Sequence, residues 1–288
     1  MVAWIIYFRE AAEYNREYIK LYIETGARLG VDVRLIIAED LKFGVKNNSY
    51  FILYRNEEIA YPDFAICRAI YPLMTRQLEL MGIKVYNNSF VAEICNDKAR
   101  TYQYLARTGI AMADTEFYKS FQLDDVLSDL NEARVIKAVG GHGGNQVFLV
   151  DPAVEDKEIA ETKKALSGSD LVVQPKIGNR NQDLRVYVIG KEIIAAVLRT
   201  ARQGFKSNYS LGGEVALYEL SKEEKELVKL IIDQFDFGLV GIDFIVADDG
   251  RLIFNEIEDV VGARMLYKCS DINIAEKYLR YIIDNLKA

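Results

Sequence analysis

The sequence contains few of the residues that build disulfide frameworks and metal sites with sulfur or imidazole ligands. Its three cysteines, Cys67, Cys95 and Cys269, are scattered, and His142 is its single histidine. The cysteines do not have the spacing of a zinc site, and three of them at these distances do not suggest a disulfide framework. We therefore expect a reducing, cytoplasmic location.

Long hydrophobic runs and an excess of positive charge are also missing. No apolar stretch approaches the roughly 20 residues that a membrane-spanning helix needs, and the apolar start of the chain is too short for a secretion signal. The formal net charge is −7, and there is no basic stripe of the kind that binds nucleic-acid phosphates. We expect neither a membrane nor a nucleic-acid partner.

The dinucleotide-binding glycine motif is absent as well. Residues 3–8 and 31–37 read as strands on either side of a helix over 11–29, which predicts a βαβ unit and a parallel sheet. The turn after the first strand has no glycine, so the backbone has no close approach to a pyrophosphate. This argues against a nicotinamide-dependent dehydrogenase.

The composition that remains is that of a globular protein with a sizeable core. With 288 residues, 50% of them hydrophobic and 27% charged, the chain is long enough for two or three compact units. Tyr14, Tyr18 and Tyr22 recur every four residues along the first helix, and we expect them to form a packing stripe. Further strands are predicted over 51–54, 64–68 and 84–86, and further helices over 75–81, 98–107 and 221–235.

A glycine-rich loop follows a predicted strand over residues 134–139. On this strand Lys137 shares a face with Val135 and Val139, and a lysine on an apolar face needs an anionic partner. Residues 140–145 then read Gly-Gly-His-Gly-Gly-Asn, and glycine amides can close over phosphate oxygens. The loop is not a P-loop, because no Gly-Lys-Ser/Thr follows. A plain turn is the alternative, and His142 is interpreted as a polar loop residue.

The strongest local pattern is a predicted β-hairpin that carries facing carboxylates. Asp249-Gly250 between two apolar runs is a preferred two-residue turn. Pairing outward from this turn places Asp243 opposite Glu256, with Glu258 on the same face. Like charges directly opposite each other are destabilising, so three carboxylates on one patch indicate a cation, and oxygen ligands favour Mg²⁺. The alternative is a solvated outer face of an edge hairpin.

The order of these motifs along the chain resembles the ATP-grasp superfamily, and most of all its RimK-like branch of ribosomal-protein glutamate ligases and related amino-acid ligases. The resemblance covers residues from about 92 to 288. The stretches that carry it are Asn96-Asp97-Lys98, Val135-Ile136-Lys137, the glycine loop, Val172-Val173-Gln174, Asp183-Leu184-Arg185-Val186, Arg199-Thr200-Ala201-Arg202, Phe205-Lys206-Ser207-Asn208, Gly241-Ile242-Asp243 and Asn255-Glu256-Ile257-Glu258.

The resemblance implies a mixed α/β (α+β) protein with the ATP-grasp fold. An N-terminal Rossmann-like domain with a parallel sheet would occupy residues 1–91. A central lid subdomain with the glycine-rich loop would occupy 92–172, and a C-terminal antiparallel-sheet subdomain with the metal site would occupy 173–288.

The resemblance also implies roles for individual residues in binding ATP and Mg²⁺. Two Mg²⁺ ions are expected, with Mn²⁺ as an alternative. The residues implied to bind the nucleotide are Lys98, Lys137, Gly141, Gly143, Gly144, Gln174, Pro175, Lys176, Asp183, Lys206 and Asn208, and those implied to hold the metal are Asp243, Glu256 and Glu258.

The implied reaction forms an acyl phosphate from ATP and a carboxylate, which an amine then attacks. Arg199 and Arg202 are the catalytic candidates, because their donors suit a carboxylate and a tetrahedral intermediate. The substrates would be a small-molecule or peptide carboxylate and an amine, and a homo-oligomer is left open. A ligase with another acceptor, or an ATP-binding regulatory or scaffold protein, is the alternative.

Three positions depart from the family pattern. Pro175 stands where the hinge is usually acidic, Glu258 stands where asparagine is usual, and Val260-Val261-Gly262 replaces Ser-Pro-Gly. The additional carboxylate at Glu258 affects the metal site, and the departures do not support a glutamate-specific assignment.

Overall fold

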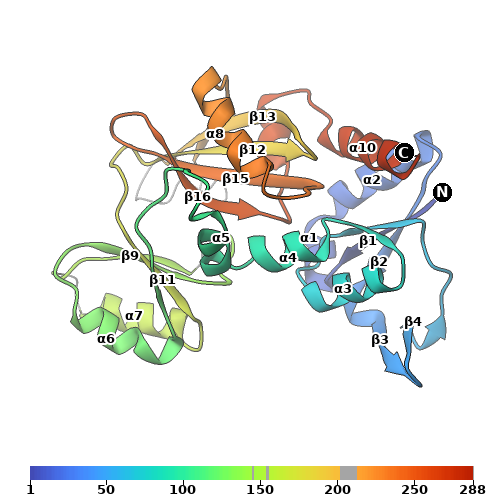
Figure 1. Cartoon of the computed structure of the whole chain (residues 1–288), viewed down its shortest axis with the longest axis horizontal. Helices are drawn as coiled ribbons and strands as arrows, with labels where there is room; N and C mark the ends of the chain where they lie inside the picture. The colour runs from blue at the N-terminus through green and yellow to red at the C-terminus, as the bar shows by residue number, and fades with distance from the viewer. Residues whose placement is uncertain (145, 154–155, 202–212, 288) are drawn as a thin grey trace.

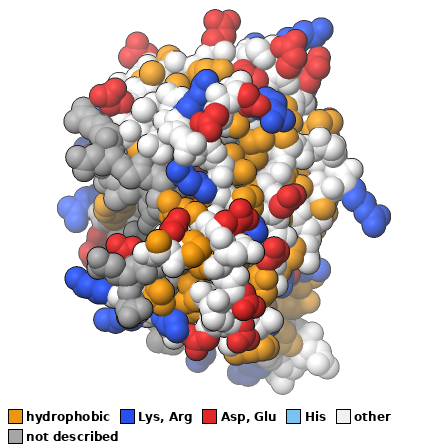
Figure 2. Space-filling view, turned by 90° about the vertical axis from the view of Figure 1, so that its left-hand side faces the viewer, with side chains coloured by type: hydrophobic (Ala, Val, Ile, Leu, Met, Phe, Trp, Pro, Cys, Tyr) orange, Lys and Arg blue, Asp and Glu red, His pale blue; other side chains and the backbone are white. Residues whose placement is uncertain are grey.

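The computed structural model describes residues 1–144, 146–153, 156–201 and 213–287. Figure 1 shows three parts: a parallel sheet beside both chain termini, a large antiparallel sheet, and a smaller sheet that carries α6 and α7. None of the helices in these ranges is long and apolar enough to cross a membrane. On the face drawn in Figure 2, acidic and basic side chains are interspersed rather than gathered by sign.

The N-terminal sheet is parallel, as the βαβ pattern predicts. Its order is β2-β1-β6-β7, and β1 pairs with both β2 and β6. The predicted helix over 11–29 is divided in two at Asn15, whose side-chain amide donates to the carbonyl of Ala11. The elements are β1 (Val2–Tyr7), α1 (Arg9–Tyr14), α2 (Arg16–Arg28), β2 (Asp32–Ile37), η1 (Ala38–Asp40), β6 (Phe64–Cys67), α3 (Pro72–Leu80) and β7 (Lys84–Tyr86).

A small antiparallel sheet interrupts this unit, and the sequence analysis found one strand of it. It consists of β3 (Leu41–Lys46), β4 (Ser49–Tyr54) and β5 (Glu57–Glu58). The turn between β3 and β4 places Asn47 and Asn48 in the left-handed region, with φ of 50° and 58°. Asparagine tolerates this conformation, which suits a two-residue hairpin turn. The prediction over 51–54 therefore recovered only the second strand.

The smaller sheet, which carries α6 and α7, is antiparallel, in the order β10-β9-β11-β8. Helices α6 and α7 lie on one of its faces (Figure 1), where Leu123, Ile136 and Leu166 belong to one buried cluster. On its other face, Val135 and Lys137 line a cavity that is described below. The elements are β8 (Glu116–Tyr118), η2 (Ser120–Gln122), α6 (Leu123–Ser128), β9 (Arg134–Ala138), β10 (Val147–Val150), α7 (Asp156–Leu166) and β11 (Leu171–Pro175).

The large sheet is antiparallel, in the order β14-β13-β12-β15-β16. One face buries Val186, Phe244 and Phe254 in a cluster with residues of α4, α5 and α8. The predicted helix over 221–235 is α8, and it begins with a capping box in which Ser221 and Glu224 satisfy each other's backbone amides. The elements are α4 (Ser89–Cys95), α5 (Lys98–Leu105), β12 (Gln182–Ile189), β13 (Glu192–Thr200), β14 (Glu214–Tyr218), α8 (Lys222–Ile232), β15 (Leu239–Val246) and β16 (Leu252–Glu258).

The chain then returns to the N-terminal sheet through α9 (Arg264–Cys269) and α10 (Ile274–Lys287). Ile19 of α2, Val197 of β13 and Leu279 of α10 are all buried in a single hydrophobic cluster. The N-terminal unit and the large sheet therefore share a core, which fixes the carboxyl ends of β1 and β6 relative to the large sheet.

Candidate nucleotide and substrate site

The β15–β16 hairpin brings Asp243 and Glu256 opposite each other, as the sequence predicts, but through a different turn. Val246 pairs with Leu252, so the loop between the strands is longer than the predicted two-residue turn at Asp249-Gly250. The register then shifts between the pairs Phe244–Phe254 and Asp243–Glu256. The longer loop displaces the strand pairing by one residue, and the register shift cancels this displacement. The predicted pair of Asp243 and Glu256 is therefore present.

The register shift leaves Asn255 as an additional residue on β16. A bulge of this kind re-aims side chains and is frequent beside active sites. Here both Asn255 and Glu256 line the same cavity, although neighbouring residues on a regular strand face opposite ways. The bulge thus adds an amide to the carboxylates of this edge.

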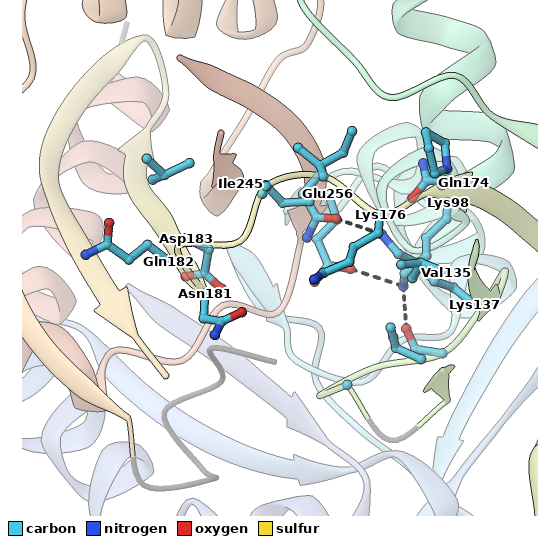
Figure 3. A pocket seen from close by; sticks show the side chains of 18 residues that line it. Lys98, Val135, Lys137, Gln174, Lys176, Asn181, Gln182, Asp183, Ile245 and Glu256 are labelled. Atoms are coloured by element: carbon cyan, nitrogen blue, oxygen red, sulfur yellow. Dashed lines mark hydrogen bonds and ion pairs between the residues drawn. The ribbon is translucent and has the colours of Figure 1, made fainter. Parts of the chain in front are cut away.

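The cavity lies between the sheet of β9 and β11 and the large sheet. Figure 3 shows Lys98, Lys137 and Gln174 on one side of it and Asn181, Gln182 and Asp183 on the other. Apolar side chains of Val135, Val147 and Ile245 complete its walls. The predicted nucleotide-binding residues that line it are Lys98, Lys137, Gly141, Gly144, Gln174, Pro175, Lys176 and Asp183. One cleft therefore collects side chains from residue 98 to residue 256.

Two lysines are buried at the end of this cavity where Glu256 lies. Lys98 is 8% exposed, and its Nζ lies 3.1 Å from Glu256 Oε2 and donates to the carbonyl of Gly141. Lys137 Nζ donates to Asn255 Oδ1 at 2.8 Å. Burial lowers the pKa of Lys137 to about 8, and the nearby charge of Lys98 acts in the same direction. An anionic ligand between these lysines would offset the cost of burying their charges and would reduce their mutual repulsion.

An alternating network of arginines and carboxylates covers the neighbouring face of the large sheet. Arg185 donates two hydrogen bonds to Asp243, from Nε to Oδ1 at 2.8 Å and from Nη2 to Oδ2 at 2.7 Å. Its Nη1 forms an ion pair with Glu258. Arg199 donates to the same Asp243 Oδ2 at 2.7 Å and also to Asp183. Arg185 and Asp243 are cross-strand neighbours, as are Asp183 and Arg199. Sheet pairing thus determines the order of the network.

The charges in this network respond to burial in different ways. Burial opposes ionisation of Asp243, but Arg185 and Arg199 outweigh it and lower the pKa to about 2. Burial raises the pKa of Asp183 to about 6 against the attraction of Arg199. Burial also raises the pKa of Glu258, whereas Lys98 overcomes burial and lowers that of Glu256. Asp243 and Glu256 are therefore the firmly ionised members.

The predicted metal ligands are only partly arranged for a cation. Glu256 and Glu258 border a second cavity and supply the hard oxygen donors that suit Mg²⁺. Asp243 is fully buried and bound to both arginines. Within the described ranges, no cluster of three or more His, Cys, Asp and Glu side chains is placed to hold a metal ion. The donor chemistry fits Mg²⁺ at Glu256 and Glu258, and Asp243 would join them by releasing a guanidinium.

The second cavity opens next to the first and has a volume of about 810 Å³. Gly144 and Glu256 border both cavities, so the two are neighbours. Among the predicted residues, Gly143, Arg199 and Glu258 line the second one. Its far wall consists of Tyr7 at the end of β1 together with Tyr14, Tyr18 and other residues of α1 and α2. Tyr22 is packed in the core as predicted, but Tyr14 is 70% exposed, so the tyrosines do not form one packing stripe.

Some predicted residues are not among the described residues that line the two cavities. Arg202, Lys206 and Asn208 lie outside the described residues. His142 is exposed and is not one of the described residues that line the two cavities. Partial desolvation of its ring by neighbouring residues, together with the charge of Lys98, lowers the pKa of His142, which favours the neutral form.

The sequence analysis assigned no role to three residues that the structure brings to the site. Arg185 alternates with Asp183 on β12, and this spacing on one strand face was an available signal. Asn255 enters the cleft through the bulge, which the strand pattern does not show. Arg68 follows β6 and reaches the second cavity only through the tertiary fold.

Comparisons with known proteins identify the family of this chain. The family model of the RimK-like ATP-grasp domain matches residues 95–282. A relative from Legionella pneumophila, named as a probable alpha-L-glutamate ligase, is 32% identical over 210 residues, which cover 72% of this chain and 69% of the relative.

Two solved structures share the fold over nearly the whole chain. A RimK domain ATP-grasp protein from Sphaerobacter thermophilus has a TM-score of 0.73 at 17% identity, with 98% of this chain and 99% of that chain covered. The ATP-grasp ligase PsnB, in complex with a precursor variant, Mg and ADP, has a TM-score of 0.69 at 16% identity, with 99% and 98% covered.

Proposed function

The chain belongs to the RimK-like ATP-grasp family of ATP-dependent carboxylate–amine ligases, and on this premise we propose that it joins an amino-acid or peptide carboxylate to an amine through an acyl phosphate. The reaction would release ADP and phosphate. The observation that carries the proposal is the junction of the two cavities at Gly144 and Glu256. There the γ-phosphate of a nucleotide in the first cavity would meet a carboxylate in the second.

In the first cavity, Lys98 and Lys137 would bind the nucleotide phosphates. Both are buried and lie within reach of Glu256 or Asn255, so phosphate oxygens would complete their coordination. The glycine loop between β9 and β10 would cover the phosphates. Gln174, Pro175 and Lys176 would contact the base through backbone groups, and the acidic side chain usual at the hinge is not required for that contact.

Mg²⁺ would be held by Glu256 and Glu258, with Asp243 as a further ligand, and when bound it would neutralise charge on the transferred phosphoryl group. Two ions, or Mn²⁺ in their place, belong to the same proposal. Arg199 lines the second cavity and would bind the reacting carboxylate and the tetrahedral intermediate. Lys206, Asn208 and Arg202 would complete the nucleotide and substrate contacts.

The decisive experiment traps the acyl phosphate. The protein is incubated with Mg-ATP, hydroxylamine and pools of small carboxylates and peptides, and both ADP and hydroxamates are measured. Hydroxamate formed in step with ADP would identify the carboxylate, and the hydroxylamine is then replaced by amines to find the natural acceptor. Lys137→Met and Glu256→Gln should lose hydroxamate formation while they keep the fold.

The alternative is an ATP-binding regulatory or scaffold protein. It predicts nucleotide binding without ADP release in every pool, with or without amines. That result would refute the ligase proposal, because the reaction cannot proceed without cleavage of the γ-phosphate.

A further inference from the structure

Arg68 lies at the point where the strand order of the N-terminal sheet reverses. In the order β2-β1-β6-β7, the chain leaves β1 toward β2 on one side and leaves β6 toward β7 on the other, so the switch point lies between β1 and β6. Tyr7 is the last residue of β1, and Arg68 directly follows β6. In open parallel sheets, ligands bind at the carboxyl ends of the strands at this point. Tyr7 and Arg68 both line the second cavity.

The guanidinium of Arg68 is buried but has no carboxylate partner in the described part of the chain. Arg68 is 8% exposed. Its Nε donates to Tyr7 Oη at 3.2 Å and its Nη2 donates to the carbonyl of Val261 at 2.9 Å. The guanidinium carbon lies 5.5 Å from the centre of the Tyr18 ring. These hydrogen bonds go only to neutral groups, and Asp259, whose pKa burial raises against the opposing charge of Arg68, forms no ion pair with it, so part of the desolvation of the guanidinium is left uncompensated.

The other arginines in the lining differ from Arg68. Arg185 and Arg199 already bind carboxylates. Arg264 is exposed at the rim and stacks 3.9 Å from the centre of the Tyr14 ring. Among the described residues that line this cavity, Arg68 is therefore the buried arginine that forms no ion pair with a carboxylate, which leaves it open to an anion from solution. Its rigid hydrogen bonds to Tyr7 and Val261 hold it ready to receive one.

We propose that Arg68 binds a free carboxylate of a substrate, one that is not itself phosphorylated, with Tyr7 and Tyr18 forming the wall around it. The reacting carboxylate has to lie at Glu256, where the two cavities meet, and Arg68 does not border the first cavity. The substrate in the second cavity thus carries at least two polar ends. This inference rests on the proposed function and adds a substrate class: an acid or amino acid with an additional carboxylate, in either the acyl donor or the amine.

The test pairs a change in the protein with the matching change in the substrate. Wild type, Arg68→Gln and Arg68→Lys are assayed with aspartate, glutamate and short peptides, and with the mono-amides of each. Arg34→Gln, an exposed arginine on β2, is the matched control. The hydroxylamine reaction reports on the donor alone, whereas coupling to an amine reports on both substrates, so the two assays show which substrate carries the free carboxylate.

We expect Arg68→Gln to raise KM for the acid about 10- to 100-fold, with KM for ATP unchanged and Arg68→Lys in between. The wild type should discriminate against one mono-amide by a similar factor, and Arg68→Gln should lose this discrimination. Equal effects of Arg68→Gln on acids and amides would overturn the inference. The preference of the wild type for acid over amide tests it even where Arg68→Gln does not fold, since equal use of acid and amide refutes it.

If the ligase proposal fails, binding of acids at Arg68 can still be measured separately. Without turnover, binding of the same acids to wild type and Arg68→Gln is measured by calorimetry in the presence of ADP. Binding that depends on Arg68 would preserve the anion site while the ligase proposal is refuted. Absence of such binding would refute the Arg68 site as well.

Discussion

Asp243 and Glu256 are cross-strand partners, yet their side chains turn to different counterions. Asp243 is bound by Arg185 and Arg199, and Glu256 is paired with Lys98. Two carboxylates on neighbouring strands are thus each neutralised from a different direction. This division separates an arginine network in the sheet from the lysines of the first cavity.

The first prediction concerns the charge of Lys137. Replacing Lys137 by Met should lower kcat/KM for ATP about 100- to 1,000-fold, because a phosphate contact that stabilises the transition state is lost. The fold should persist, since Met fills a similar volume without a buried charge. Steady-state kinetics and thermal unfolding measure the two effects. Lys164→Met, an exposed change on α7, is the control, and an unchanged KM and kcat in Lys137→Met would remove Lys137 from the site.

The second prediction concerns proton uptake on nucleotide binding. The pKa of Lys137 is about 8 in the free protein, because burial lowers it, and a bound phosphate should raise it. Above pH 8 the free protein has largely lost this proton, so ADP should bind with uptake of up to one proton and with an affinity that decreases as pH rises. Near pH 6.5 Lys137 is already protonated and contributes no uptake.

Calorimetry in buffers with different ionisation enthalpies at pH 8.5 measures this uptake. Asn255→Asp is the matched variant, since it places a carboxylate where the amide oxygen lies 2.8 Å from Lys137 Nζ and should keep the lysine protonated. The uptake should then disappear, as it should in Lys137→Met. The same uptake in all three proteins would contradict the assignment.

The third prediction concerns the buried network around Asp243. Asp243→Asn removes the charge that both Arg185 and Arg199 hold, and leaves two buried guanidiniums with weaker partners. We expect a loss of about 3–5 kcal/mol in the free energy of unfolding, together with loss of Mg-dependent turnover. Urea denaturation measures the stability. Asp249→Asn, in the exposed hairpin loop, should leave the urea midpoint nearly unchanged, and equal midpoints in the two variants would contradict the network.

The fourth prediction separates two glycines of the loop. Gly144 has a φ of 75° and borders both cavities, so Gly144→Ala strains the backbone and should lower kcat/KM for ATP about 10-fold. A Cβ at Gly140 would meet no atom within 4 Å, and its φ is not in the left-handed region. Gly140→Ala should therefore change the same constant less than about 2-fold. Equal effects in the two variants would show that the conformation of Gly144 does not matter for ATP.

Much of the cleft could be predicted because its residues lie in local patterns. The capping residue Asp97 marks the start of α5 at Lys98, as the predicted helix over 98–107 requires, and strand alternation places Lys137 on the face that it uses. The family resemblance supplied the order of these motifs, and the fold that it implies is the fold observed. The roles of the individual site residues remain predictions.

The hairpin register shows how local rules can give a correct pair for an incorrect reason. Turn preference favours Asp249-Gly250, but it does not predict the wider loop or the bulge at Asn255, because both depend on how the strands pack against their neighbours. Phe254 of β16 is fully buried, and its amide bonds to the carbonyl of Ala111. Such contacts come from distant parts of the chain.

The sequence pattern indicated the hairpin of β15 and β16, the glycine loop, and the lysines and carboxylates that line the first cavity, since each depends on the spacing of near neighbours. The tertiary structure alone decided which charges pair. It directed Arg185 and Arg199 to Asp243, and it brought Arg68 beside the cavity that ends at Glu256. Asp243 lies 58 positions from Arg185 and 44 positions from Arg199. Contacts across such separations arise when sheets and helices share one core, and no local pattern contains them.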